Sequence, residues 1–228
     1  MFVFSPSNMS TYRTCPRKFQ AQTITKELPW QATAQKSRGT LVHNVVEMAL
    51  RSGLDAVTSW PEGIDLDYTR NSVAEARAAA GSGGKILIEE EFTLNKSFNP
   101  APEGWWDKTA FIRARADAVI IPADGKPPLV VDIKTGKKWD DDDFQLRINA
   151  LLLHFAKKFP VIRYEYWYVD SGETFGNTID FARGLSPVQD VIELMKEMST
   201  SIRDSYFPSQ KNKFCKWCGL SGTPSCGL

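Results

Sequence analysis

Val130-Val131-Asp132-Ile133-Lys134-Thr135-Gly136 is a run of apolar β-formers that carries an aspartate and a lysine two residues apart. Side chains two apart on a strand leave the same face of a sheet, so Asp132 and Lys134 are expected to lie side by side. An ionised carboxylate that emerges from a buried strand is costly unless it has a partner or binds a metal. The segment therefore predicts a buried strand that ends in a functional pair of charges.

The spacing of this pair is weak evidence by itself, because an Asp-x-Lys triplet is expected about once by chance in a chain of this length. A second copy, Asp124-Gly125-Lys126, lies between two expected strands. There Asp-Gly suits the backbone of a hairpin turn and Lys suits solvation. We interpret this second copy as a turn and the copy at Asp132 as functional.

The segments around this strand alternate between helical and strand periodicity. Helical spacing predicts helices over 7–19 (with a stop near Cys15-Pro16), 38–51, 67–80, 144–159 and 186–206. Runs of β-formers predict strands over 86–94, 111–116, 118–121, 129–133, 164–169 and 174–180. A linker is expected after residue 19 and a flexible connection at 81–84. The order predicts an α/β or α+β fold in which a central mixed sheet is flanked by helices.

Composition and charge narrow the class of protein. The 228 residues, 42% hydrophobic and 24% charged, are enough for one soluble domain with a substantial core. A formal net charge of +1 excludes a protein drawn to nucleic acid by its overall field, so any DNA contact must be local. The N-terminus has no features of a secretory signal and no run is long enough to cross a bilayer, which predicts an intracellular, cytoplasmic protein.

Further polar residues can complete a metal site around Asp132. Asp117 follows the expected strand 111–116, and two carboxylates on adjacent strands can share Mg²⁺ or Mn²⁺. His43 and Glu47 are four apart on a helix and project from one face, although a single helical His is more simply an ordinary polar residue. Such a metal would polarise a phosphate and acidify a bound water, which is what phosphodiester hydrolysis requires.

Lys134 and Gln145 can serve the same chemistry. The Lys134 ammonium can orient a water or stabilise developing negative charge. Gln145, at the start of the helix 144–159, can hydrogen-bond a phosphate or Lys134, or be an ordinary exposed residue. The tandem Trp105-Trp106 can stack on unpaired bases, but packing against the sheet is the simpler expectation.

Four cysteines form a second constellation: Cys15, Cys215, Cys218 and Cys226. An intracellular chain of this size does not need disulfides, so ligation of a metal centre is the leading interpretation. Four-cysteine sites hold zinc or an iron-sulfur cluster, and spacing does not separate the two. A site that joins residue 15 to residues 215–226 would pin both ends of the chain together. The surrounding basic residues are a collar for DNA phosphates or merely solvated charges: Arg13, Arg17, Lys18, Lys211, Lys213 and Lys216.

In one order along the chain, these motifs resemble those of a known family. The stretch 5–19 with Cys15, the segment Gly39-Thr40-Leu41-Val42-His43, Asp117, the segment 131–136 and Gln145 are similar to the RecB-like branch of the PD-(D/E)XK nuclease superfamily. Within it they look like the CRISPR-associated and phage exonucleases that carry an iron-sulfur cluster. Asn149 stands where the last motif of that family usually has a tyrosine.

The resemblance implies a restriction-endonuclease-like core and a set of roles. It implies Mg²⁺ or Mn²⁺ bound by His43, Asp117, Asp132 and the main-chain carbonyl of Ile133, with catalysis by Asp117, Asp132, Lys134 and Gln145. It implies a 4Fe-4S cluster, in preference to zinc, on Cys15, Cys215, Cys218 and Cys226.

The same resemblance implies how the chain is organised and what it acts on. One nuclease domain would span 1–228, with a core at 38–206 and a cluster subdomain formed by 1–30 and 207–228. The expected partner is DNA with a single-stranded segment or a free end, together with protein partners in recombination or DNA processing. The expected activity is that of an exonuclease. The alternatives are a non-catalytic DNA-binding or recombination scaffold on the same fold, a nuclease that binds zinc rather than a cluster, and a zinc-ribbon protein whose chemistry lies elsewhere.

Overall fold

A mixed five-stranded sheet forms the centre of the protein. The computed structural model describes residues 2–28, 34–138 and 142–226, with side chains in the second range from residue 37. In the described chain the strands lie in sequence order: β1 (Lys85–Asn95), β2 (Ala110–Ile121), β3 (Leu129–Lys134), β4 (Val161–Tyr168) and β5 (Glu173–Asp180). β3 and β4 are parallel and the other neighbours are antiparallel. The parallel pair needs a crossover, which α5 (Phe144–Lys157) supplies.

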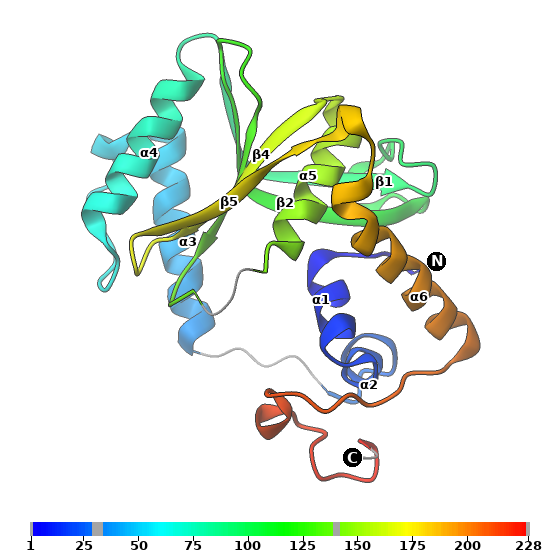
Figure 1. The fold of residues 1–228 in the computed structure, drawn as a ribbon. Helices are drawn as coiled ribbons and strands as arrows, with labels where there is room; N and C mark the ends of the chain where they lie inside the picture. Colours follow the sequence, from blue (N-terminus) through cyan, green and yellow to red (C-terminus); the bar gives the residue numbers. More distant parts are fainter. Residues whose placement is uncertain (1, 29–33, 139–141, 227–228) are drawn as a thin grey trace.

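Helices cover both faces of this sheet (Figure 1). α5 packs on one face, with α1 (Pro6–Thr14) and α6 (Gln189–Asp204) beside it, and their apolar side chains form one core. α3 (Ala34–Ser52) and α4 (Leu66–Ala80) pack on the other face around a second core. We call these the α5 core and the α3–α4 core. The expected architecture, a restriction-endonuclease-like mixed sheet flanked by helices, is confirmed.

The alternation of side chains along β2 between the two cores reverses at Asp117. Before it Ala114 and Ala116 belong to the α5 core, whereas after it Ala118 and Ile120 belong to the α3–α4 core. The same reversal occurs in β1 at Glu89, which has a left-handed φ of 54°. Glu89 lies between the residue pairs 88–118 and 90–116 of the β1–β2 ladder. The prediction of two strands, 111–116 and 118–121, was therefore wrong. They are one strand whose alternation reverses, and Asp117 lies inside it.

The N-terminal helical segment breaks at Cys15. α1 ends at Thr14, Cys15 is extended with φ −165°, and α2 (Pro16–Phe19) begins immediately after it. Pro16 has no N–H and disfavours helical geometry in the residue before it, which explains the break. The expected linker instead continues as a π-helical turn (Gln20–Ile24).

The other expected elements lie within a few residues of their observed bounds. Short 3₁₀ turns are added at Leu54–Ala56, Gly104–Trp106, Phe181–Arg183, Ser186–Val188 and Cys215–Trp217. Trp106 is 81% exposed, so the expectation that it packs against the sheet was wrong. In the part of the chain described, no helix is long and apolar enough to span a membrane.

The N-terminal helices and the C-terminal tail lie together, and Figure 1 shows the tail below α1 and α2. The N–H of Arg17 donates to the carbonyl of Pro208 (3.2 Å), and its Nε donates to the carbonyl of Ser225 (2.8 Å). The hydroxyl of Tyr12 bonds that of Ser201 (2.7 Å). Protein contacts alone therefore bring residue 15 near residues 215–226.

The connection at 81–84 is a packed turn, which its glycine content had not indicated. A Cβ on Gly84 would lie closer than 3.0 Å to the carbonyl oxygens of Ala80 and Ile121, whereas one on Gly83 would meet only the Ala123 side chain, at 3.5 Å. We expect Gly84→Ala to lower the free energy of unfolding by about 1–3 kcal/mol through overpacking. Gly83→Ala is the matched control and should change it by less than about 0.5 kcal/mol. Urea denaturation followed by circular dichroism measures both; equal effects would contradict the close packing at Gly84.

Candidate active site

Asp132, Lys134 and Gln145 form a closed triad at the end of β3. Lys134 Nζ lies 2.6 Å from Asp132 Oδ2 and donates to Gln145 Oε1 at 3.1 Å. Gln145 Nε2 donates to Asp132 Oδ1 at 2.5 Å. Asp132 is only 3% exposed and lies in the interior of the sheet. The structure thus places Asp132 and Lys134 on one face, as expected, and Gln145 in contact with both.

Asp117 joins β2 to β3 where their ladder stops. The ladder pairs 120–129, 119–130 and 118–131, and at the next position the Asp117 carboxylate accepts the N–H of Ile133 (2.7 Å). The same oxygen, Oδ2, lies 3.4 Å from Nδ1 of His43 on α3. A side-chain oxygen therefore replaces a backbone acceptor and stays open toward the helix.

His43, Glu47 and Asp117 form the set of potential metal ligands, with one ligand atom from each within 4.8 Å of the others. His43 and Glu47 are one turn apart on α3, so the helix presents both to Asp117. Asp132 lies outside this group and is held by Lys134 and Gln145. Glu47 thus joins His43 and Asp117, two members of the expected ligand set, in one group.

The carboxylates of the site repel one another. Burial raises the pKa of Asp132 to about 6, with Asp117 adding to the shift and Lys134 opposing it. Burial, Glu89 and Asp117 raise the pKa of Glu47 to about 7. Burial lowers the pKa of His43, but its hydrogen bond to Asp117 and the nearby carboxylates raise it overall. A cation placed among these groups would relieve the repulsion.

Comparison with known proteins assigns the family. The family model of the PD-(D/E)XK nuclease superfamily matches residues 3–223. The chain belongs to the PD-(D/E)XK nuclease superfamily. None of the curated proteins compared with it is a match. Among solved structures, the crystal structure of SSO0001 is 16% identical, with a TM-score of 0.47 over 98% of this chain and 86% of that one.

Membership makes the protein a nuclease, and PD-(D/E)XK nucleases act on DNA with divalent metals. The donor set of this PD-(D/E)XK nuclease suits such an ion, because carboxylates are the ligands that Mg²⁺ and Mn²⁺ prefer and an imidazole is tolerated by Mn²⁺. His43, Glu47 and Asp117 supply these donors.

One residue of the site was missed from the sequence. Glu89 hydrogen-bonds Glu47, and its carboxylate pairs with Arg115 at 2.6 Å. In the sequence it is the first of three consecutive glutamates, 89–91, which reads as a solvated run. The signal that separates it from the other two is the reversal of apolar alternation between Ile88 and Phe92, which puts Glu89 opposite Asp117.

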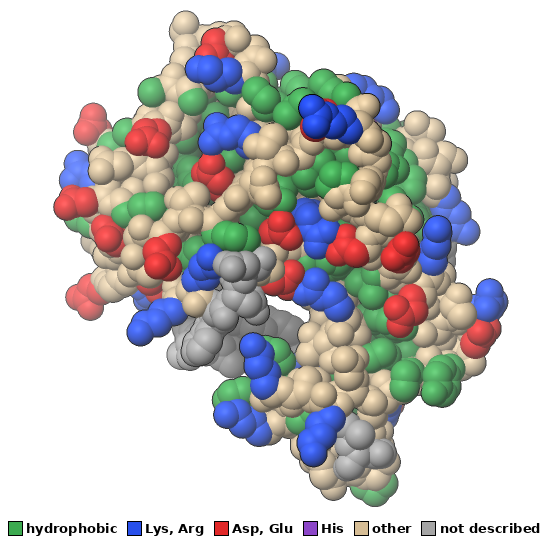
Figure 2. Space-filling view, viewed as in Figure 1, with side chains coloured by type: hydrophobic (Ala, Val, Ile, Leu, Met, Phe, Trp, Pro, Cys, Tyr) green, Lys and Arg blue, Asp and Glu red, His purple; other side chains and the backbone are tan. Residues whose placement is uncertain are grey.

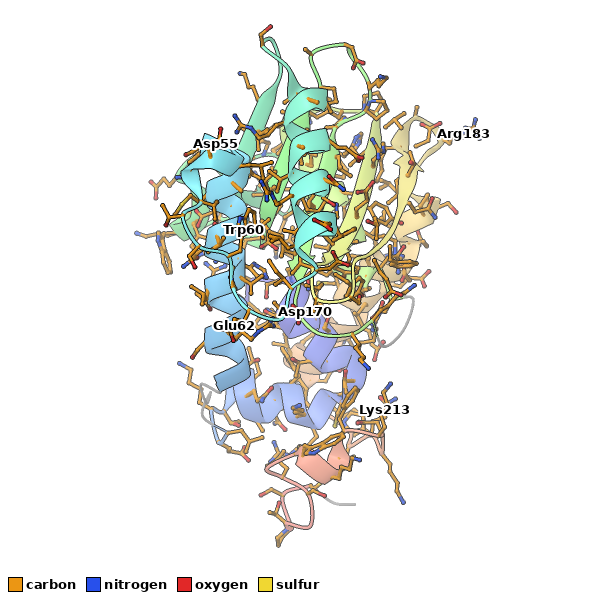
Figure 3. The ribbon with its side chains drawn as sticks, turned by 90° about the vertical axis from the view of Figure 1, so that its left-hand side faces the viewer. Asp55, Trp60, Glu62, Asp170, Arg183 and Lys213 are labelled. Carbon is orange, nitrogen blue, oxygen red and sulfur yellow. The ribbon has the colours of Figure 1, made fainter. Side chains whose placement is uncertain are left out.

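The turn after Lys134 is tied to α3 through Asp170. Asp170 accepts the N–H of Gly136 (2.6 Å) and a pair of hydrogen bonds from Arg38 (2.8 and 2.9 Å). Arg38 also donates to the carbonyl of Glu62, and Figure 3 shows Asp170 and Glu62 beside the same stretch of α3. Gly136 has φ 89°, a conformation that favours glycine. The helix that carries His43 therefore also holds the backbone next to Lys134.

Asn149, at the place of the family's tyrosine, lies in the core. Its side chain is fully buried, and neither Nδ2 nor Oδ1 has a hydrogen-bond partner among the described residues. The last motif of this PD-(D/E)XK nuclease thus contributes Gln145 to the site and a buried amide one turn later.

The four cysteines line one small cavity between the α1–α2 junction and the tail. All are free thiols, and no three of their sulfurs lie within 4.8 Å of one another in the described chain. The N–H of Gln210 donates to Cys15 Sγ (3.4 Å), and that of Asn212 donates to Cys215 Sγ (3.3 Å). The cysteines share a site without forming a tight cluster of sulfurs.

The raised pKa of Glu47 predicts how stability depends on pH in the metal-free protein. The folded protein keeps a proton on Glu47 up to about pH 7, whereas the unfolded chain releases it near the ordinary value of 4.5. The free energy of unfolding therefore falls as the pH rises from about 4.5 to about 7. We expect Glu47→Gln to flatten this decline in urea denaturation with EDTA. The exposed Glu91→Gln is the control, and a decline as steep in Glu47→Gln as in wild type would contradict the assignment.

Proposed function

We propose that this protein is a Mg²⁺- or Mn²⁺-dependent DNA exonuclease of the RecB-like branch. The observation that carries the proposal is the closed triad of Asp132, Lys134 and Gln145 next to the ligand set of His43, Glu47 and Asp117. A buried carboxylate held against a lysine is costly to build without a function. The preference for strand ends, and so for an exonuclease, rests on the resemblance of the motifs.

The ion would be held by His43, Asp117 and Glu47, with Asp132 and the carbonyl of Ile133 as the further ligands that the resemblance implies. When bound, it supplies polarisation of the scissile phosphate and acidification of a water. The remaining contributions come from the chain itself.

Lys134 presents a fixed positive charge for the negative charge that develops on the phosphate. Gln145 holds the Lys134 ammonium through Oε1 and Asp132 through Nε2, so it positions both groups. Asp132 is almost inaccessible whereas the Lys134 side chain is 34% exposed, so the ammonium is anchored on a buried carboxylate and still reaches the surface. The triad is organised in advance of substrate binding.

The rival proposal, a non-catalytic DNA-binding or recombination scaffold, does not require the triad of Asp132, Lys134 and Gln145. A scaffold on the same fold would gain stability by replacing Asp132 and Lys134 with apolar residues, because buried ion pairs are weak contributors to stability. The intact triad favours the nuclease.

For the cysteine site we propose a structural 4Fe-4S cluster on Cys15, Cys215, Cys218 and Cys226, with zinc as the less favoured occupant. All four line one cavity, and backbone N–H groups point at two of the sulfurs, as thiolate ligands require. A zinc ion with bonds of about 2.3 Å would need its sulfurs closer together than they are here, because no three of the four lie within 4.8 Å of one another among the described residues. Free thiols also suit a cytoplasmic location.

Cleavage of end-labelled single- and double-stranded DNA in Mn²⁺ tests the nuclease. We expect Asp132→Ala and Lys134→Ala to lower the rate by at least about 100-fold, because each removes a preorganised charge from the site. Asp124→Ala and Lys126→Ala remove a pair with the same spacing and a comparable ion pair of 2.7 Å, on an exposed turn, and should cleave like wild type. An inert wild type, or triad variants as active as wild type, would end the proposal. A circular substrate left intact while its linear form is degraded identifies an exonuclease.

A 4Fe-4S cluster would give the purified protein a visible colour. Protein purified without oxygen should show broad visible absorption and contain iron and sulfide, and Cys218→Ala should lose both and unfold at a lower temperature. Ser221→Ala, which lines the same cavity, should keep them. A colourless wild type that contains one zinc ion per chain would replace the cluster with zinc.

A further inference from the structure

A second hollow lies between the end of β3 and the cysteine-bearing tail. Its volume is about 560 Å³, and its lining includes Lys134, Lys137, Lys213, Phe214, Lys216 and Trp217. It is distinct from the cysteine cavity, although both are lined by residues of the same short segment. In Figure 2, Lys and Arg side chains lie on the body of the molecule and on the lower lobe to either side of the hollow, with Asp and Glu side chains also on the body side, and Figure 3 shows Lys213 on the tail side.

The described residues that line this hollow carry charge of one sign. Four lysines line it, and none of the described residues that line it is acidic. The whole chain has a formal net charge of +1, so this concentration is local. In a nearly neutral protein, a positive groove attracts a polyanion locally, whereas the overall field of the protein does not.

Two aromatic rings are exposed in the same place. Trp217 is 71% exposed and Phe214 is 46% exposed, and their ring centroids are 6.5 Å apart. Lys216 Nζ lies 3.9 Å from the centre of the Trp217 ring, and Lys213 Nζ lies 5.2 Å from that of Phe214. Exposed rings with neighbouring cations are the elements that bind single strands, because bases stack on the rings while phosphates meet the cations.

The two arginines of the expected collar are already engaged. Arg13 pairs with Asp142 and lies over the Phe144 ring, and Arg17 pairs with Glu27. Lys213 and Lys216 differ from these arginines in lining the hollow.

Lys134 connects this hollow to the active site, because it lines the hollow and belongs to the triad. We propose that the hollow binds single-stranded DNA and leads it to Lys134, with bases stacked on Trp217 and Phe214 and phosphates paired with Lys137, Lys213 and Lys216. The inference rests on the proposed nuclease function and names the residues that would hold the single strand expected as its substrate. A duplex keeps the faces of its bases inside its own stack, so only an unpaired strand can use both rings.

Binding of a fluorescent oligothymidine to the anaerobically purified protein, followed by anisotropy in EDTA, tests the groove without cleavage. We expect Trp217→Ala to weaken binding by about 5- to 150-fold, the loss that one base–aromatic stack produces, and Trp217→Phe to retain most of it. Tyr206→Ala removes an aromatic side chain that is 68% exposed and outside the hollow, and it should bind like wild type. Visible absorption and circular dichroism should be unchanged in all three variants.

The lysines give a second readout. Lys213→Ala and Lys216→Ala should each reduce the slope of log Kd against log salt by about 0.7, the value for one phosphate contact on a single strand. Lys126→Ala, on the exposed turn, should leave the slope unchanged.

The outcomes separate the groove from the nuclease. Equal affinity of wild type and Trp217→Ala, or a duplex that binds as tightly as the single strand with the same loss in Trp217→Ala, would overturn the groove. Either result can occur in an enzyme that still cleaves DNA in Mn²⁺. An inert wild type that shows the expected losses of binding would instead refute the nuclease and keep the groove.

Discussion

The hydrogen bond from the N–H of Ile133 to the Asp117 carboxylate is the contact on which the site depends. Beyond the 118–131 pair the ladder between β2 and β3 stops, and a side chain takes over the role of a backbone acceptor. Because the bond uses Oδ2, the carboxylate is fixed between the strands and still faces His43. The sheet thus opens at one position without leaving the Ile133 N–H unpaired, which would cost about 1–3 kcal/mol. The opening is possible because the alternation of β1 and β2 reverses at Glu89 and Asp117, so a polar pair occupies the place of two packed apolar residues.

Burial of the Asp132 carboxylate is costly, and its contacts with Lys134 and Gln145 offset part of that cost. Asp132 is almost inaccessible, and its pKa of about 6 shows that the ionised form is disfavoured there even with Lys134 at 2.6 Å. Gln145 satisfies the second oxygen and fixes the lysine at the same time. On the α3 side, Glu47 and Glu89 share a hydrogen bond, and the pKa of Glu47 rises to about 7. Electrostatic repulsion is therefore concentrated where a divalent cation would relieve it, while the stability of the domain comes from the two apolar cores on either side.

Local patterns predicted most of the fold and named every residue of the candidate site except Glu89. The strand at Asp132, its same-face lysine and the helices of both layers followed from periodicity, which depends only on nearby residues. Asp117 was found but placed at a strand end, because a reversal of alternation inside one strand looks like two strands in sequence. Glu89 was missed for the same reason, since only the pairing of β1 with β2 puts it opposite Asp117. The π-helical turn after Phe19 and the packing of Gly84 depend on distant backbone contacts that composition does not encode.

Arg38 and His43 lie on the same helix, and through Asp170 the first of them holds the backbone of Gly136. Any displacement of α3 along the sheet would therefore shift the imidazole, Glu47 and the turn that follows Lys134 together. The two halves of the site are mechanically linked, so a fluctuation that loosens one loosens the other. Catalytic competence should then be lost in a single step when α3 detaches, rather than gradually as separate side chains lose their places.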